Sequence, residues 1–591
     1  MGSCCPPCGN PIQCAFNSRP DRFPKNLSGL PQVKLLIEPT DTSELTEQPV
    51  VTAVAPPPKN LGEDRGVIKA ATVLAVGNVA SRVLGLVREI VKSNLFGASP
   101  LLAAYTVAAL VPMTLFNLIT GGEMVSSSLV PVFSDYAAKE KRAELWQVVS
   151  TVLSLATAVL IIIVLGVEIF AQQIAWLAGA RNFTDQALFD VTVDLMRLTA
   201  PAVLFLSIAS ILTGVLFSLK RFTWPAFTSA IFNGTIVIVA LLRPNEISSL
   251  AWGLLLGSFL QIVIQLPGLR DARFRFTLHW RHPAVRRITI LYAPILAALI
   301  VNQIAIWISY NLAILTGDNS VTYMTYATTL YQFPLGLVVT ALSLAILPTL
   351  SQIASAFVTA QEADNETLAE EKANEFKETL ASGLRMIIAL ILPAMAGLWA
   401  LALPIVTLLL EHGRFTPHDS QITAVVLSVY LIGLPFAAID RMLVYASYAR
   451  KDTWRPALAG ILSIIIYTIT AVLLLKPLGL YSLMVADAVK QIVHTFMMIF
   501  ILNGQIGSMR GYQINTTILK SIAAAVASGL AAYAAAQLAS FLLTNDDLLA
   551  RFLIVAAGGA VGLVVYLAMV LWLDIPEVKS LAGLVRRKVR G

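Results

Sequence analysis

The 591 residues are 57% hydrophobic and 13% charged, whereas about a quarter of the residues in a soluble globular chain are charged. This composition excludes an ordinary soluble globular protein and favours one that spans a membrane many times. The formal net charge is +7, but the lysines and arginines stand in short segments between apolar runs and near the C-terminus, where they set topology. We therefore expect no nucleic-acid partner.

The first segment, residues 1–64, contains Pro56, Pro57 and Pro58 and has little periodic apolar pattern. Such a segment buries too little surface to offset the entropy of ordering it, so we expect a disordered cytoplasmic tail. The cysteines of the chain all lie in this tail without a histidine nearby, and they predict neither a metal site nor another cofactor. They are Cys4, Cys5, Cys8 and Cys14.

Apolar runs of about twenty residues, the length that crosses the hydrocarbon core of a bilayer, recur from residue 67 almost to the C-terminus. They predict an all-α polytopic membrane protein with about fourteen transmembrane helices. The expected spans are 67–97, 100–136, 145–178, 186–218, 222–243, 247–268, 285–316, 320–357, 376–411, 419–449, 454–476, 479–503, 514–543 and 549–574.

Lysine and arginine are distributed unevenly among the loops that join these spans. Loops after even-numbered spans contain most of them, as in residues 139–142 and 270–287, whereas loops after odd-numbered spans contain few. Cytoplasmic loops collect positive charge. The pattern therefore predicts an even number of spans, both termini in the cytoplasm and a multi-pass location in the cytoplasmic (inner) membrane.

The chain repeats itself weakly. Residues 218–226 resemble residues 448–457, and residues 129–134 resemble residues 346–351. Both matches join a span to the span six further on, so the copies face the same way, and we expect two six-helix lobes related by a pseudo-two-fold axis along the membrane normal, with a cavity between them. The expected organisation is an N-terminal lobe at 65–275, a C-terminal lobe at 276–505, and two further helices with a basic tail at 506–591.

The first span carries Arg82, Arg88 and Glu89. A charge within a span is costly and usually faces a cavity or a partner. Arginine presents a permanently charged fork that suits phosphate oxygens, so a lipid with a pyrophosphate group is a plausible ligand. The alternative interpretation is structural: Arg88 and Lys92 extend to the membrane interface, and Arg82 pairs with Glu89.

Other charged residues within spans leave both structural and functional interpretations open. Glu123 follows two glycines in the second span, which indicates either a bent helix or a helix break beside a cavity. Asp487 and Lys490 are three residues apart, and Asp440 adjoins Arg441, so these residues can form neutral pairs or an ion-coupling relay. Sequence patterns for nucleotide hydrolysis, metalloproteases and serine hydrolases do not occur in the chain, which favours a transporter over an enzyme.

Seven short motifs occur in order along residues 67–575. They are Ser81-Arg82-Val-Leu-Gly85-Leu-Val-Arg88-Glu89, Phe96-Gly97-Ala98, Val130-Pro131-Val-Phe, Tyr331-Gln-Phe-Pro334-Leu-Gly336, Ile346-Leu-Pro348-Thr-Leu-Ser, Gly383-Leu-Arg385 and Gly413-Arg414-Phe-Thr. In these motifs the chain resembles the MurJ (MviN) family of lipid II flippases, within the multidrug/oligosaccharidyl-lipid/polysaccharide exporter superfamily.

The resemblance implies two lobes around a central cavity, a lipid groove formed by two C-terminal helices, and alternating access that carries an undecaprenyl-diphosphate-linked peptidoglycan precursor outward for cell wall synthesis. It implies that Arg82 and Arg88 engage the lipid diphosphate. The candidate substrate-binding residues are Ser81, Arg82, Arg88, Glu89 and Glu123. The expected partners are this lipid-linked precursor and membrane lipids, and we expect a monomer.

The chain departs from the family pattern at positions where the family carries cavity charges. Ala103 stands where an acidic residue is usual, Phe116-Asn117 where an arginine pair is usual, and Thr328-Thr329 where Asp-Arg is usual. An exporter of another polyprenyl-linked glycan or of a drug-like substrate is therefore the second hypothesis. A third is a non-transporting scaffold that recruits partners through its N-terminal tail.

Overall fold

The computed structural model describes residues 61–138, 140–543 and 547–578, and this part of the chain is helical, without strands. The described helices all belong to one compact unit. The expected N-terminal tail lies outside the described residues, except that residues 61–64 already belong to the first helix.

The N-terminal lobe comprises the helices up to residue 269. They are α1 (Leu61–Phe96), α2 (Pro100–Ile119), α3 (Gly122–Met124), η1 (Val125–Leu129), α4 (Val130–Asp135), α5 (Arg142–Ile169), α6 (Ala171–Leu177), η2 (Ala180–Asn182), α7 (Gln186–Thr199), α8 (Ala202–Ser218), α9 (Thr223–Ala226), α10 (Thr228–Leu242), α11 (Ser248–Gln265) and η3 (Leu266–Leu269).

The C-terminal lobe and two further helices follow. They are α12 (Pro283–Ile314), α13 (Ser320–Pro334), η4 (Leu335–Val339), α14 (Thr340–Glu362), α15 (Glu366–Ala400), α16 (Ala402–Leu410), α17 (Pro417–Leu431), α18 (Leu434–Ala449), α19 (Trp454–Leu478), α20 (Tyr481–Ile506), α21 (Ile514–Leu542) and α22 (Leu548–Trp572).

Each expected span coincides with one of these helices or with a span broken into two to four consecutive elements. Within the described residues, 10 helices are long and apolar enough to cross a membrane by themselves, and up to 11 if the bent pair α17 and α18 is one span. The other expected spans are short, broken or charged. The observed helices thus agree with about fourteen spans without fixing that number.

Two of the broken spans contain π-helical turns. η1 ends two residues before Pro131 in the second span, and η4 directly follows Pro334 in the eighth. Proline lacks an amide hydrogen and disrupts the helical ladder, and a wider turn accommodates the disruption. Backbone groups freed within a membrane need internal partners. At the first break, the carbonyl oxygen of Thr120 accepts from the hydroxyl of Ser210, and the Thr120 hydroxyl donates to Ser207 at 2.7 Å.

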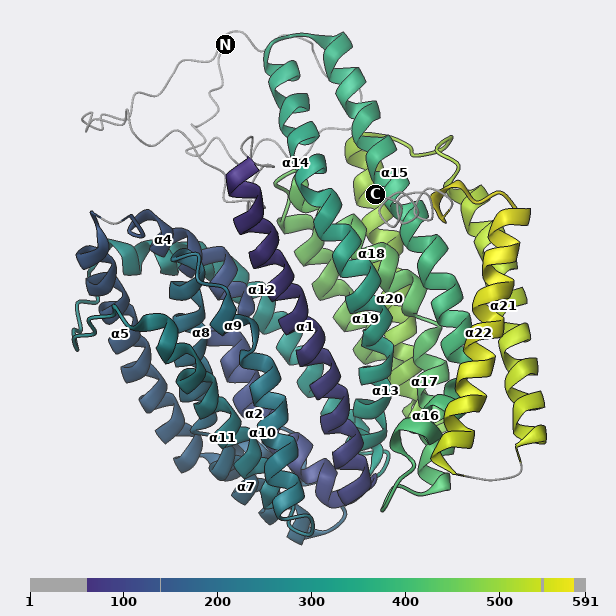
Figure 1. Cartoon of the computed structure of the whole chain (residues 1–591), viewed down its shortest axis with the longest axis horizontal. Coiled ribbons are helices and arrows are strands. Elements are labelled where there is room, and N and C mark those ends of the chain that lie inside the picture. Colours follow the sequence, from purple (N-terminus) through teal and green to yellow (C-terminus); the bar gives the residue numbers. More distant parts are fainter. Residues whose placement is uncertain (1–60, 139, 544–546, 579–591) are drawn as a thin grey trace, which may run out of the picture. The chain divides into compact units, whose positions relative to one another are not determined.

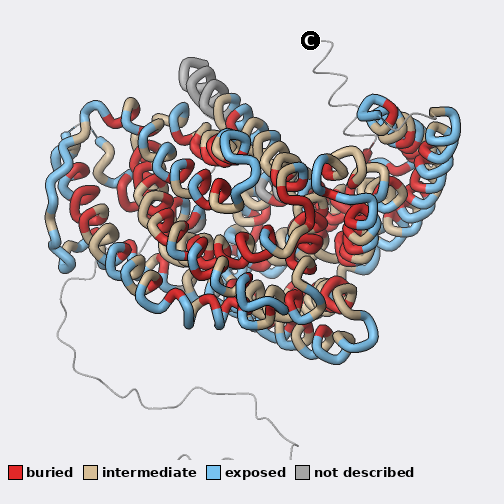
Figure 2. The backbone as a smooth tube through the Cα atoms, turned by 90° about the horizontal axis from the view of Figure 1, so that it is seen from below, coloured by how far each residue is buried: buried red, intermediate tan, exposed pale blue. Residues whose placement is uncertain are grey.

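The packing of the helices confirms the internal repeat. In the N-terminal lobe α1 packs on α10, α2 on α7, α8 on α11, and α10 on α11. The C-terminal lobe repeats these contacts six spans later, as α12 on α19, α13 on α17, α18 on α20, and α19 on α20. Figure 1 shows the two lobes as a purple-to-teal group and a green group. Figure 2 shows buried segments inside the groups and exposed segments along their outer faces.

The repeat extends to the ends of α8 and α18. Each helix is followed by a lysine in the left-handed region, Lys220 with φ 57° and Lys451 with φ 60°. In both cases the next backbone amide donates to the carbonyl five residues before it, at 2.8 Å for Arg221 and 3.0 Å for Asp452. This is the Schellman ending, which usually places glycine at the left-handed position.

Helices α21 and α22 pack on each other and on α15 and α16 of the C-terminal lobe. Small residues line the contact between α21 and α22. The Ser528 hydroxyl donates to the carbonyl of Gly562 at 2.8 Å, and a β-carbon added to Gly562 would lie 2.9 Å from that of Ala532. Arg385 forms an ion pair with Glu577 at 2.8 Å and so connects α15 to the segment after α22.

Replacing Gly562 with leucine should separate α21 from α22, because the contact has no room for a side chain. Overpacking of this kind lowers the free energy of unfolding by about 2 kcal/mol. The loss of stability is measured as a lower thermal unfolding midpoint of the chain purified in detergent. Gly559→Leu is the matched control, because a β-carbon there meets nothing within 4 Å. Equal midpoints for the two variants would contradict the close contact.

Candidate functional site

The site is built on α1, which lies close against α9 and α10. Gly77 makes the approach possible, because a β-carbon there would lie 2.2 Å from the carbonyl oxygen of Ala226. One turn further along the contact, the amide of Asn233 on α10 donates to the carbonyl of Ser81 at 3.2 Å and accepts from Arg88 Nη1 at 2.9 Å. Asn233 therefore fixes the position of α1 and of the Arg88 side chain together.

A buried cluster of three charges follows on α1. Glu89 accepts from Arg88 Nη2 at 2.7 Å and from Lys92 Nζ at 2.8 Å, each through a different carboxylate oxygen. The side chains of Glu89 and Lys92 are 4% and 8% exposed, whereas Arg88 is 30% exposed. The cluster therefore has one excess positive charge. Arg88 is the most exposed of the three side chains, so this charge is accessible through its guanidinium.

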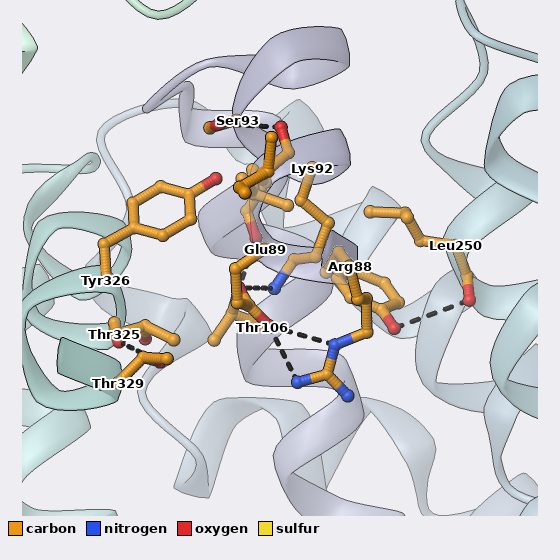
Figure 3. Close-up of polar contacts among 12 residues, drawn as sticks. Arg88, Glu89, Lys92, Ser93, Thr106, Leu250, Thr325, Tyr326 and Thr329 are labelled. Carbon is orange, nitrogen blue, oxygen red and sulfur yellow. Dashed lines mark hydrogen bonds and ion pairs between the residues drawn. The ribbon is translucent and has the colours of Figure 1, made fainter. Parts of the chain in front are cut away.

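Residues from both lobes surround this cluster. Figure 3 shows Thr106 of α2 beside Arg88 and Glu89, and Thr325, Tyr326 and Thr329 of α13 on the other side of Glu89. The lobes are also joined by hydrogen bonds from α12 to Thr114 of α2, which the sequence did not indicate. Trp307 Nε1 donates to the Thr114 hydroxyl at 3.0 Å, and this hydroxyl donates to Gln303 at 3.2 Å.

Arg82 points toward the C-terminal lobe. A β-carbon added to Gly336, in the π-turn η4, would lie 2.7 Å from both terminal nitrogens of Arg82. Gly336 thus provides the space that the guanidinium occupies. Within the described part of the chain, Arg82 makes no hydrogen bond or ion pair. Its partly exposed guanidinium remains available to an anion at the contact between the lobes.

The structural interpretations of these charges need correction. Glu89 pairs with Arg88 and Lys92 and not with Arg82, because the three paired side chains occupy adjacent turns on one side of α1. Arg88 and Lys92 therefore do not extend freely to an interface. Glu123 lies in α3, but its side chain is outside the described part of the structure.

The charged residues of α18 and α20 also form specific pairs. Asp487 and Lys490 form the expected ion pair on α20. Asp440 Oδ1 on α18 accepts from His494 Nδ1 on α20 at 2.6 Å, so Asp440 pairs with a residue of another helix. Spacing along one helix predicted the first pair, whereas the second depends on how α18 and α20 face each other.

On one side of the molecule, two glycine-containing loops close the contact between the lobes. Gly97 after α1 and Gly413 after α16 both have positive φ, 61° and 59°. The amide of Arg414 donates to the carbonyl of Asn94 at 2.9 Å, and a β-carbon on Gly97 would lie 2.5 Å from the Arg414 carbonyl oxygen. Tyr326 packs edge-on against Phe415 beside this contact. Both loops follow odd-numbered spans.

Sequence reasoning placed Ser81, Arg82, Arg88 and Glu89 on one helix. The structure brings Arg82 and Glu89 beside the C-terminal lobe, whereas Ser81 and Arg88 contact Asn233 of the N-terminal lobe. It overlooked Asn233, which holds both Ser81 and Arg88. The available signal was an amide side chain in an otherwise apolar span, where an unpaired polar group is costly.

Comparisons with known proteins agree on one family. A family model described as lipid II flippase MurJ matches residues 92–550. The lipid II flippase MurJ of Burkholderia cenocepacia is 30% identical over 389 residues, which is 64% of this chain and 72% of the relative. The probable lipid II flippase MurJ of Vibrio cholerae is 30% identical over 416 residues, 67% of this chain and 75% of the relative.

Solved structures share the fold. A lipid II flippase MurJ in an inward closed conformation superposes with a TM-score of 0.68 at 23% identity, covering 84% of this chain and 98% of that chain. An inward-facing multidrug transporter of the MATE family has a TM-score of 0.58 at 15% identity, covering 73% and 95%. At these identities the likeness concerns the fold alone.

Replacing Glu89 with glutamine should destabilise the protein strongly, because Arg88 and Lys92 would keep their charges without a carboxylate. Breaking a buried ion pair in this way costs about 3 kcal/mol. Thermal unfolding of the purified chain measures the loss. Adding Lys92→Met to the same chain should recover much of the stability, since it removes the most buried cation. If the Glu89→Gln variant were as stable as the parent, Glu89 would not be the buried partner of these two cations.

Proposed function

Because the chain belongs to the MurJ family of lipid II flippases, we propose that it carries an undecaprenyl-diphosphate-linked peptidoglycan precursor from the cytoplasmic to the outer leaflet of the inner membrane. The protein acts as a transporter and not as an enzyme, in monomeric form and without a cofactor or a nucleic-acid partner. Its many membrane-spanning helices and the agreement of family, relatives and fold support this proposal.

The observation that carries the proposal is the environment of Arg82. A diphosphate needs cationic donors that are not already neutralised, and an arginine fork binds phosphate oxygens through two hydrogen bonds at once. Arg82 makes no ion pair within the described residues, and its guanidinium lies at the contact between the two lobes, beside Gly336. Arg88 adds the excess charge of its cluster on the same helix.

The arrangement of the loops supports transport by alternating access. Loops after even-numbered spans carry most of the basic residues, which favours a cytoplasmic location for them and for both termini. The contact between Asn94, in the last turn of α1, and Arg414, in the loop after α16, lies at the ends of odd-numbered spans and is therefore on the outer side. The lobes are closed outward in this state, and an outward-open state requires that contact to separate.

A different lipid-linked glycan or a drug-like substrate is the second candidate, and three positions favour it. Ala103 is fully buried. Thr328 and Thr329 donate their hydroxyls to backbone carbonyls of their own helix at 2.9 Å. None of these side chains supplies the charge that the family pattern has there, so the substrate-facing surface is less charged than that pattern implies.

Replacing Arg82 with alanine should lower the rate of lipid II transfer across reconstituted vesicles by about tenfold or more, because a charge-assisted contact to the diphosphate is lost. Gly336→Ala should lower it as well by displacing the guanidinium. The double variant should be no slower than Arg82→Ala alone, since both changes affect one contact.

Arg243→Ala is the control for loss of an arginine, because that side chain is 63% exposed in an odd-numbered loop. A parallel assay with another polyprenyl diphosphate glycan separates the two candidate substrates. Full lipid II transfer by the Arg82→Ala variant would refute the phosphate role of Arg82. If the parent protein transferred the other glycan but not lipid II, the second candidate function would be established.

Joining the two loops should block transport. In a chain with its natural cysteines replaced by serine, Asn94→Cys with Arg414→Cys should form a disulfide on oxidation, because their backbones are hydrogen-bonded at 2.9 Å. The oxidised protein should not transfer lipid, and reduction should restore transfer. Asn94→Cys alone is the control. Normal transfer by a fully cross-linked chain would exclude opening at this contact.

A further inference from the structure

A hollow of about 510 Å³ lies where the ends of α8 and α11 meet the beginning of α1, a size typical of sites for small ligands. Its lining includes Lys220, Arg221, Arg270 and Asp271, with Trp224 of α9 and Val73 of α1. It is distant in sequence from the charge cluster at residues 88–92. All its loops follow even-numbered spans, so it opens on the side that we assign to the cytoplasm.

One of the three cations is already neutralised. Arg221 Nη1 and Nη2 donate to the two carboxylate oxygens of Asp271 at 2.5 Å and 3.2 Å, and Nη1 also donates to the carbonyl of Gly268 at 2.6 Å. This hydrogen bonding lowers the pKa of the Asp271 carboxyl below its ordinary value, so the pair persists at neutral pH. Arg221 therefore shapes the hollow by holding α8 to the end of α11.

The other two cations are Lys220 and Arg270. Within the described residues, Lys220 and Arg270 make neither a hydrogen bond from their side chains nor an ion pair. Lys220 also occupies the left-handed position after α8, with φ 57°. The hollow thus carries two unneutralised positive charges.

An apolar stripe leads away from the hollow along α11. Its side chains recur at helical spacing, are all exposed and end beside Pro267, which lines the hollow. On a membrane-spanning helix such a stripe contacts lipid chains. Trp224, 38% exposed, stands at the polar end, where indole rings are typical of the membrane interface. The stripe consists of Trp252, Leu256, Phe259, Leu260, Val263 and Leu266.

We propose that this hollow binds the headgroup of an anionic membrane phospholipid, with Lys220 and Arg270 contacting the phosphate and the acyl chains lying along the exposed stripe of α11. A free phosphate would use the cations but not the stripe, and an uncharged lipid would use the stripe but not the cations. The site is separate from Arg82, and its occupant does not depend on which lipid the protein transports.

Native mass spectrometry of the full chain in detergent, titrated with phosphatidylglycerol, tests the proposal. The double variant Lys220→Gln with Arg270→Gln should bind at least about tenfold more weakly than the parent, because each basic residue near a lipid surface contributes appreciably to binding. Arg273→Gln with Arg286→Gln is the matched control. It removes the same charge from exposed positions outside the hollow and should bind like the parent.

Competition identifies the occupant. Phosphatidylcholine and inorganic phosphate should each fail to displace phosphatidylglycerol at matched concentration. The proposal is overturned if either displaces it fully, if the polyprenyl diphosphate substrate occupies the site in preference, or if both double variants lose binding equally. Thermal unfolding midpoints of the two variants, measured without added lipid, show that each is folded.

Discussion

A carboxylate buried in the first membrane helix determines how the surrounding charges are arranged. Isolated charges are costly in a medium of low dielectric constant, so Glu89 holds two cations at once, Lys92 and Arg88. Arg88 in turn bonds to Asn233 and ties α1 to α10. Because Glu89 is committed to these two partners, Arg82 on the preceding turns keeps its full charge. The cost of that isolated charge is consistent with a site that awaits an anionic ligand.

The two lobes share a framework but differ in their polar contents. The same pairs of helices contact each other in both, and α8 and α18 end in the same turn. After that turn, however, the N-terminal lobe has Arg221, paired with Asp271, whereas the C-terminal lobe has Asp452, which accepts from Gln505. The C-terminal lobe alone contains the described pair of Asp440 and His494. Duplication therefore explains the packing, and later divergence explains the chemistry.

Much of the fold was predictable because hydrophobic length and loop charge depend only on local composition. The positions of the spans, the repeat and the placement of Arg82 away from lipid all followed from such patterns. Pairings across helices were not predictable. Asp440 pairs with His494 because α18 and α20 face each other there, which the spacing along one helix does not encode. The pair of Glu89 with Lys92, three residues further along α1, follows helical spacing, and the interpretation that chose Arg82 overlooked it. Gly336 shows its role only when Arg82 is placed against it.

The contact between the loops at Gly97 and Gly413 depends on backbone atoms more than on side chains. Each glycine lies where a β-carbon would overlap the opposite loop, at 2.5 Å from Arg414 and 2.1 Å from Asn94. A contact made by backbone atoms offers little side-chain surface for a small molecule to bind. With this contact on the outer side, as we propose, inhibitors designed to reach Arg82 in this conformation enter through the cytoplasm or laterally from the bilayer, which places membrane permeability among the first requirements for such compounds.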